Sequence, residues 1–138
     1  MPKSASAYSG TPLPKKLGAD KAESVMLLHA PTGFEMLICG DDGTPRIRRG
    51  GRGQADLVIW FVTSRSELTA RIAVVKQSVA EGGGLWIAWP KKASGVVTDV
   101  SEQAVRDTGL ANGLVDYKVC AIDETWSGLL FRTRHYAA

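Results

Sequence analysis

Residues 57–89 decide the fold and read LVIWFVTSRSELTARIAVVKQSVAEGGGLWIAW. Both ends of this stretch, 57–62 and 85–89, are apolar on both faces and β-rich, which is typical of central strands covered by helices on two sides. Between them, Ser64 and Glu67 have the spacing of a helix capping box. An apolar stripe at helical spacing follows: Leu68, Ile72, Val75 and Val79. A strand, a helix and a strand with short links predict a parallel βαβ unit with a right-handed crossover.

The residues on the N-terminal side predict two further strands and a short helix. The run 24–30 (SVMLLHA) is a strand closed by Pro31, and 45–49 is a weak edge strand, where proline is tolerated. Between them, 33–39 is expected to form a helix whose Phe34, Leu37 and Ile38 face inward. Residues 1–23 show no helical or strand period and predict an extended arm, followed by one domain over 24–138.

The residues on the C-terminal side predict a helix and an antiparallel hairpin. After a loop over 90–97, Thr98 or Asp99 is expected to cap the helix and Gly109 to stop it. Strands are expected at 114–122 and 128–135, and their tight link makes them a hairpin. The resulting fold class is α/β, a Rossmann-like three-layer sandwich of about six strands.

Composition excludes several classes of protein. The chain has 138 residues, of which 44% are hydrophobic and 22% charged, as in ordinary globular domains. It has no apolar run of the roughly 18 residues that cross a bilayer and no secretory signal, so no membrane partner and a cytoplasmic location are expected. The two cysteines, Cys39 and Cys120, are widely spaced and lie in apolar surroundings, so we expect both to be buried and no metal to be bound.

Two resemblances follow from these elements. Two adjacent parallel strands, a helix and a terminal hairpin resemble the second half of a class I methyltransferase sheet, which implies the strand order 2-1-3-4-6-5. Most of the chain is also similar to an uncharacterised bacterial family, domain-of-unknown-function family 3052, and this resemblance implies no activity. The residues that carry this second resemblance are 8–18 (YSGTPLPKKLG), 61–67 (FVTSRSE), 84–99 (GLWIAWPKKASGVVTD) and 113–128 (GLVDYKVCAIDETWSG).

The fold predicts where a ligand would bind. In open parallel sheets, ligands lie outside the carboxyl ends of the strands where the strand order reverses, and helix N-termini there favour an anion. The segment 89–95 (WPKKASG) supplies two lysines beside small residues at this edge. The expected ligand contacts are Gly33, Ser64, Arg65, Lys91, Lys92 and Ser94.

The same edge argues against catalysis. The methyltransferase resemblance implies a glycine-rich turn after the first strand and an acidic residue after the second. Here the first strand is followed by 29–34 (HAPTGF) and the second by Arg48 and Arg49, so no cofactor and no methyl transfer are expected. His29 is expected to be a satisfied core histidine and Ser64 a helix cap, while Asp123 and Glu124 are expected in a hairpin turn, so no catalytic residue is assigned.

Three function classes therefore stay open. The first is a non-catalytic domain that binds a small anionic or nucleotide-like ligand. The second is a module that binds RNA or an acidic protein through its basic N-terminal part, although the tryptophans suited to base stacking lie in predicted core strands. The third is a small enzyme, which needs a carboxylate or His29 to converge on the strand-end cleft. The basic residues of the second class are Lys15, Lys16, Arg46, Arg48, Arg49 and Arg52.

Overall fold

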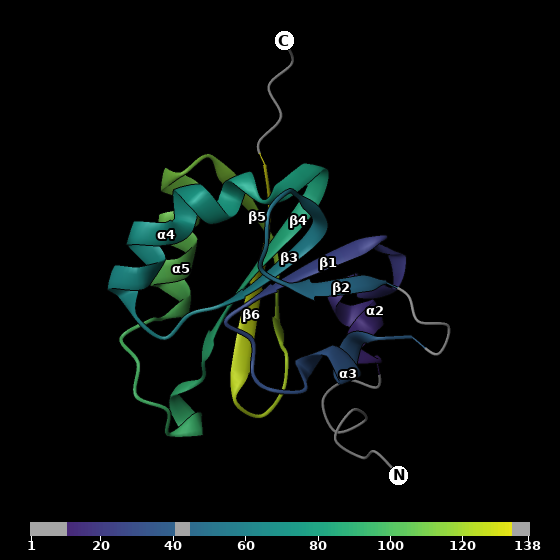
Figure 1. Ribbon diagram of the computed structural model, residues 1–138. Coiled ribbons are helices and arrows are strands. Elements are labelled where there is room, and N and C mark those ends of the chain that lie inside the picture. The colour runs from purple at the N-terminus through teal and green to yellow at the C-terminus, as the bar shows by residue number, and fades with distance from the viewer. Residues whose placement is uncertain (1–10, 41–44, 134–138) are drawn as a thin grey trace.

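A six-stranded sheet forms the centre of the computed structural model, which describes residues 11–40 and 45–133. The strand order is β2-β1-β3-β4-β6-β5; β1 to β4 pair in parallel, and β6 is antiparallel to both of its neighbours (Figure 1). This confirms the predicted order and the terminal hairpin. The strands are β1 (Ser24–Leu28), β2 (Arg46–Arg49), β3 (Ala55–Phe61), β4 (Val79–Pro90), β5 (Leu114–Ala121) and β6 (Trp126–Thr133).

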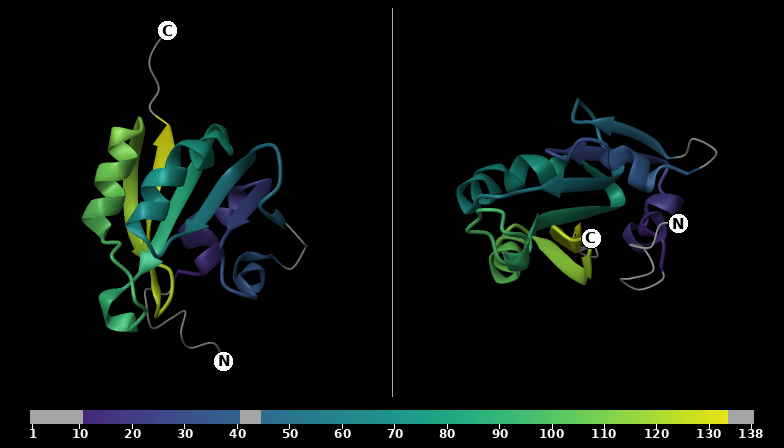
Figure 2. Two further views of the ribbon diagram at one scale, coloured as in Figure 1. Left: turned by 60° about the vertical axis from the view of Figure 1, so that its left-hand side comes forward. Right: turned by 90° about the horizontal axis from the view of Figure 1, so that it is seen from below.

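Helices cover both faces of the sheet and complete three layers (Figure 2). One face packs against α4 (Arg65–Gln77) and α5 (Glu102–Ala111), which bury Ile72 and Val105 against Trp60 and Phe131. The helices on the other face are α2 (Leu13–Leu17), the 3₁₀ helix η1 (Ala19–Lys21) and α3 (Phe34–Ile38). Among the described residues, no helix is long and apolar enough to cross a membrane.

The N-terminal segment differs from the extended arm that was predicted. Within the described residues 11–23, α2 and η1 are helical and bury Leu17 and Ala19 in the core. The Leu17 carbonyl accepts a 2.8 Å hydrogen bond from the indole N–H of the fully buried Trp86. A five-residue helix is too short to show a period, so only tertiary contacts reveal it. Residues 1–10 lie outside the described part.

Four helix details also differ from the predictions. Leu37 is 48% exposed, because a helix as short as α3 turns only Phe34 and Ile38 inward. Helix α5 is capped by Ser101, whose hydroxyl accepts from the Ala104 amide at 3.1 Å, rather than by Thr98 or Asp99. Gly109 lies inside α5 and does not stop it; a Cβ there would come within 2.3 Å of the Phe131 ring. Glycine at this position therefore serves close packing of helix on strand. Helix α4 begins at its predicted Ser64 cap, but Val79 belongs to β4.

Two irregularities interrupt the strand pairing. Between Ala55 and Leu57 of β3, the pairing partner on β4 advances from Val79 to Gly84, so the intervening residues of β4 bulge out of the ladder. On β5, Tyr117 is an extra residue, because Asp116 and Lys118 pair with consecutive residues of β6. Bulges of this kind redirect side chains and are common beside functional sites.

Candidate functional site

The strand order reverses between β1 and β3, and His29 stands at this point, directly after β1. It is the one non-glycine residue of the described part with a positive φ, +56°. Its side chain is 61% exposed, and its Nδ1 atom lies 2.7 Å from Oε2 of Glu67 in the first turn of α4. The prediction of a core histidine is therefore wrong, because the left-handed backbone leaves the strand and turns the ring outward. A left-handed backbone outside glycine is uncommon and is often found at functional positions.

Glu67 is a functional candidate that the sequence patterns did not reveal. The capping-box spacing assigned its carboxylate to the helix backbone, and Ser64 does accept a hydrogen bond from the Glu67 amide at 3.0 Å. The carboxylate instead reaches across from α4 to the end of β1. Only the parallel arrangement of β1 and β3 brings these distant segments together, and no local sequence signal encodes it.

Arg49, the last residue of β2, forms hydrogen bonds with the turn that follows β1. Its guanidinium donates to the carbonyl oxygens of Ala30 and Pro31 at 2.8 and 2.7 Å and to both carboxylate oxygens of Glu35 at 2.6 and 3.0 Å. Hydrogen bonding from Arg49 lowers the pKa of Glu35 from its ordinary value of 4.5 to about 2. The end of the second strand, beside the position where the methyltransferase resemblance implies an acidic residue, thus carries a cation bound to the chain's own oxygens.

The predicted contacts after β3 are satisfied within the protein. The Arg65 amide donates to the carboxylate of Asp99 at 2.8 Å, and Thr98 donates to the Thr63 carbonyl at 2.7 Å. Two amides at the start of α4 are therefore bonded to Ser64 and Asp99. The Arg65 side chain is exposed and extends the positive charge of this edge.

The predicted contacts after β4 form a turn of their own, the 3₁₀ helix η2 (Lys92–Ser94). The Ser94 hydroxyl donates to the Lys91 carbonyl at 2.6 Å and accepts from the Val96 amide at 3.1 Å. The Lys91 amide donates to the Thr125 carbonyl at 2.8 Å, and the Lys92 side chain is exposed. Gly33, with a φ of +83°, has open space where a Cβ would stand. The six predicted residues thus lie on three neighbouring strand ends rather than in one turn.

The remaining candidates occupy ordinary structural positions. Trp60, Trp86 and Trp89 are buried in strands, as predicted, and one Asp123 carboxylate oxygen accepts from two amides of the hairpin turn. Cys39 is exposed, which corrects the expectation of burial, while Cys120 is half-buried and burial raises the pKa of its thiol. Within residues 11–40 and 45–133, no group of acidic, histidine or cysteine side chains could hold a metal ion.

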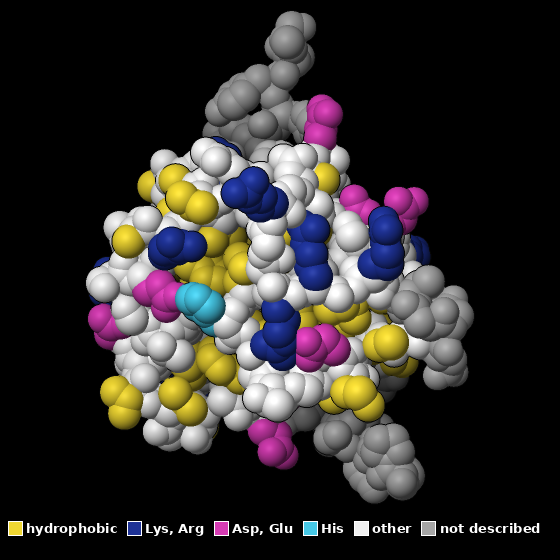
Figure 3. Space-filling model, viewed as in Figure 1, with side chains coloured by type: hydrophobic (Ala, Val, Ile, Leu, Met, Phe, Trp, Pro, Cys, Tyr) yellow, Lys and Arg dark blue, Asp and Glu magenta, His cyan; other side chains and the backbone are white. Residues whose placement is uncertain are grey.

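Basic side chains are spread over one face of the molecule (Figure 3). Arg46 and Arg48 are exposed on β2, and Arg52 is exposed in the loop that follows. Arg49 differs from these neighbours because its charge is paired with Glu35. The face seen in Figure 3 also carries acidic side chains, and a histidine side chain lies beside one of them, so its charge is mixed.

No protein-family model matches the chain, and neither does any curated protein sequence. The resemblance to family 3052 therefore stays a prediction. Solved structures do match. The protein PigF bound to SAH has a TM-score of 0.64 at 9% identity; the match covers 89% of this chain and 60% of that one. The chain thus spans less than two thirds of PigF.

Two further structures extend the comparison. Magnesium protoporphyrin IX methyltransferase from Synechocystis, with bound SAM, has a TM-score of 0.63 at 12% identity, covering 88% of this chain and 76% of that one. A S-adenosylmethionine-dependent methyltransferase from Clostridium acetobutylicum has a TM-score of 0.61 at 8% identity, covering 86% and 88%. At such low identities the likeness establishes the fold alone, which is methyltransferase-like.

Proposed function

We propose that this chain is a non-catalytic binding domain on a methyltransferase-like fold. Its ligand is a small anionic or nucleotide-like molecule at the carboxyl ends of β1, β3 and β4. The observation that carries the proposal is the Arg49 arrangement, in which a guanidinium bonded to two carbonyls and Glu35 stands where a carboxylate is expected in a working cofactor site. A guanidinium there cannot accept the hydrogen bond that a carboxylate accepts from a cofactor hydroxyl.

Positive charge at the neighbouring strand ends supports an anionic ligand. Arg65 follows β3, and Lys91 and Lys92 follow β4, so three cationic residues lie on the β3 and β4 side of the point where the strand order reverses. Ser94 fixes the backbone of the lysine turn through its two hydrogen bonds, which keeps that turn in one shape before a ligand arrives. Gly33, which follows β1 in the same turn as His29, has open space where a Cβ would stand.

Thermal unfolding with SAM, adenosine and guanosine nucleotides, NAD, coenzyme A and a short RNA, at low and moderate salt, tests this proposal. A ligand at a hundredfold its Kd adds about 2.7 kcal/mol to the free energy of unfolding, a shift of several degrees. We expect one small molecule to raise the Tm at both salt concentrations. The double variant Lys91→Ala/Lys92→Ala should lose at least tenfold in affinity without a lower Tm.

The matched control removes two other cations, as Arg46→Ala/Arg48→Ala. It should leave the affinity for the small molecule unchanged. Unchanged affinity in the lysine variant would contradict the proposal. A shift produced only by RNA, abolished by salt and by the arginine variant, would favour the nucleic-acid module instead.

A second candidate function, a small enzyme, is favoured by one observation. Glu67 converges on the exposed His29 at 2.7 Å, and a carboxylate can hold an imidazole in one orientation for proton transfer. Hydrolysis of p-nitrophenyl acetate tests it, with His29→Asn as the variant, because asparagine tolerates a left-handed backbone. A rate that does not fall in this variant rules out the imidazole as the base for this reaction.

A further inference from the structure

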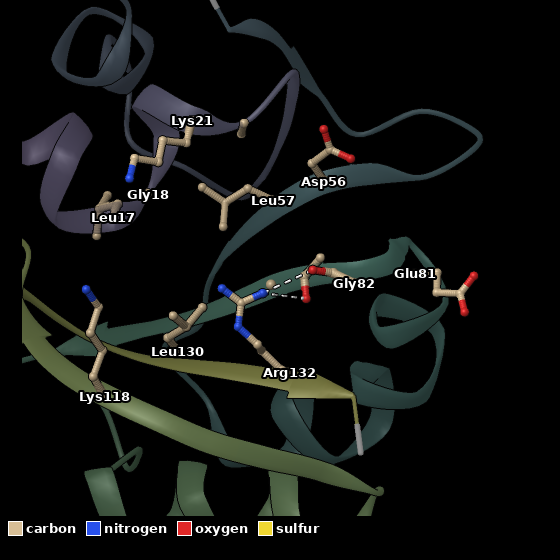
Figure 4. A pocket seen from close by; sticks show the side chains of 13 residues that line it. Leu17, Gly18, Lys21, Asp56, Leu57, Glu81, Gly82, Lys118, Leu130 and Arg132 are labelled. Carbon is tan, nitrogen blue, oxygen red and sulfur yellow. Dashed lines mark hydrogen bonds between the residues drawn. The ribbon is translucent and has the colours of Figure 1, made fainter. Parts of the chain in front are cut away.

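A cavity of about 360 Å³ lies at the amino-terminal ends of β3 and β4. The candidate ligand site lies at the opposite, carboxyl ends of these strands. It is bounded by the segment that joins α2 to η1, the amino-terminal end of β3, the start of β4, the middle of β5 and the C-terminal half of β6 (Figure 4). Its apolar wall is formed by Leu17, Leu57 and Leu130. A volume of this size falls in the range of pockets for small organic ligands.

The two bulges of the sheet lie beside this cavity and determine which residues line it. On β4, residues 80–83 leave the pairing with β3, and the cavity lies beside them. On β5, Asp116 faces α5, where its carboxylate accepts from Arg106 at 2.9 Å. Without the bulge, Lys118 would face the same way, because side chains alternate along a strand. The extra residue Tyr117 reverses the alternation and brings Lys118 to the cavity side.

Three cations converge on the cavity from three different elements: Lys21, Lys118 and Arg132. Figure 4 shows their nitrogen atoms turned toward the space between α2 and β6, whereas the carboxylates of Asp56 and Glu81 point outward. The Asp56 carboxylate is engaged elsewhere, since it accepts from the Glu23 amide at 3.0 Å.

Arg132 is held in place from two sides. Its Nη1 donates to the carbonyls of Gly82 and Gly83 at 3.1 and 3.4 Å, and its guanidinium carbon lies 5.2 Å from the centre of the Tyr117 ring. These contacts leave the other guanidinium nitrogens available to a ligand. Both bulges thus contribute directly to the position of this side chain.

We propose that this cavity is a second binding site, whose ligand is a small organic phosphate with an apolar body. The lining carries these three cations and two carboxylates, Asp56 and Glu81, which point outward. A phosphate monoester carries between one and two negative charges at neutral pH and offers the cations three acceptor oxygens, one more than a carboxylate. The leucine wall accommodates the apolar part. The site is independent of the function proposed above, because it uses none of the residues at the carboxyl edge.

Titration of ¹⁵N-labelled protein with phenyl phosphate tests this site, with the amide signals of Gly82, Gly83 and Gly84 as the reporters. We expect saturating shifts at these three amides. The variant Lys21→Ala/Lys118→Ala should raise the Kd at least tenfold, and its spectrum also reports whether it is folded. The matched control Lys91→Ala/Lys92→Ala removes the same charge at the opposite edge and should leave the Kd unchanged.

Two related probes separate the parts of the ligand. Benzyl alcohol should give no saturable shift, and benzoate should bind at least tenfold more weakly than phenyl phosphate. Benzoate binding as tightly as phenyl phosphate would overturn the phosphate assignment. Absence of saturable shifts at the three glycines, or equal weakening in both lysine variants, would overturn the site itself. Failure of the nucleotide panel at the carboxyl edge would leave this titration unaffected.

Discussion

Replacing Gly109 by alanine sets two physical effects against each other. Gly109 lies inside α5, and alanine is more favourable than glycine there by about 0.8–1.0 kcal/mol because of helix propensity. A Cβ at this position, however, would lie 2.3, 2.4 and 2.9 Å from three carbon atoms of the Phe131 ring. The ring is fully buried, so moving it would displace the core side chains packed around it.

The steric effect is expected to win. Overpacking of a core costs typically about 1–3 kcal/mol, and contacts this short place Gly109→Ala at the upper end of that range. After the gain in helix propensity, the free energy of unfolding should fall by about 2 kcal/mol. With an unfolding entropy of roughly 2.1 cal/mol/K per residue, the Tm should fall by about 7 °C.

Urea unfolding of a double-mutant cycle checks this reasoning. Phe131→Leu is destabilising by itself, but it removes part of the ring that the new methyl group would meet. In that background Gly109→Ala should cost less than it does alone, with a coupling of about 1–3 kcal/mol. If Gly109→Ala raises the stability of the otherwise unchanged protein, helix propensity dominates and the packing argument is refuted.

Two further predictions concern single ionisable groups. In Arg49→Gln, the pKa of Glu35 should rise from about 2 toward 4.5, as followed by NMR titration of its carboxyl carbon. Because the folded-state pKa is depressed, the stability from this group is present above pH 4.5 and is lost as the pH falls toward 2; the variant should lack that acid-dependent loss. A pKa that stays near 2 would show that Arg49 is not its cause. At pH 8, iodoacetamide should modify the exposed Cys39 at least tenfold faster than Cys120, whose thiol pKa is raised by burial; mass spectrometry of the peptides measures both rates, and equal rates would contradict this ranking.

The sheet was largely predictable because the composition of its strands is distinctive. The runs around Val58 and Ile87 are apolar on both faces, and short links between strand and helix allow few topologies. The Ser64 cap was predictable for a similar reason, since its hydrogen bond to the Glu67 amide is local in sequence.

The candidate sites depend on contacts between distant segments, which no local pattern encodes. Asp99 has the sequence features of a cap for its own helix, but its carboxylate bonds to the Arg65 amide of α4. His29 has the features of a strand residue, but its backbone turns out of the strand. The bulge that brings Lys118 to its cavity leaves no mark in the sequence except an extra residue, which is visible only once β6 is paired beside it.

The two edge strands of the open sheet, β2 and β5, also bear on pairing between molecules. An unpaired edge strand offers its backbone to another molecule, and proteins resist this with short strands, charged side chains or bulges. Strand β2 has four residues and exposes Arg46 and Arg48, while β5 at the other edge carries the Tyr117 bulge and the exposed Lys118. Each edge thus combines a charged side chain with a second obstacle to strand addition. Replacing Arg46, Arg48 or Lys118 for binding studies would therefore also remove a charge that opposes β-pairing between molecules.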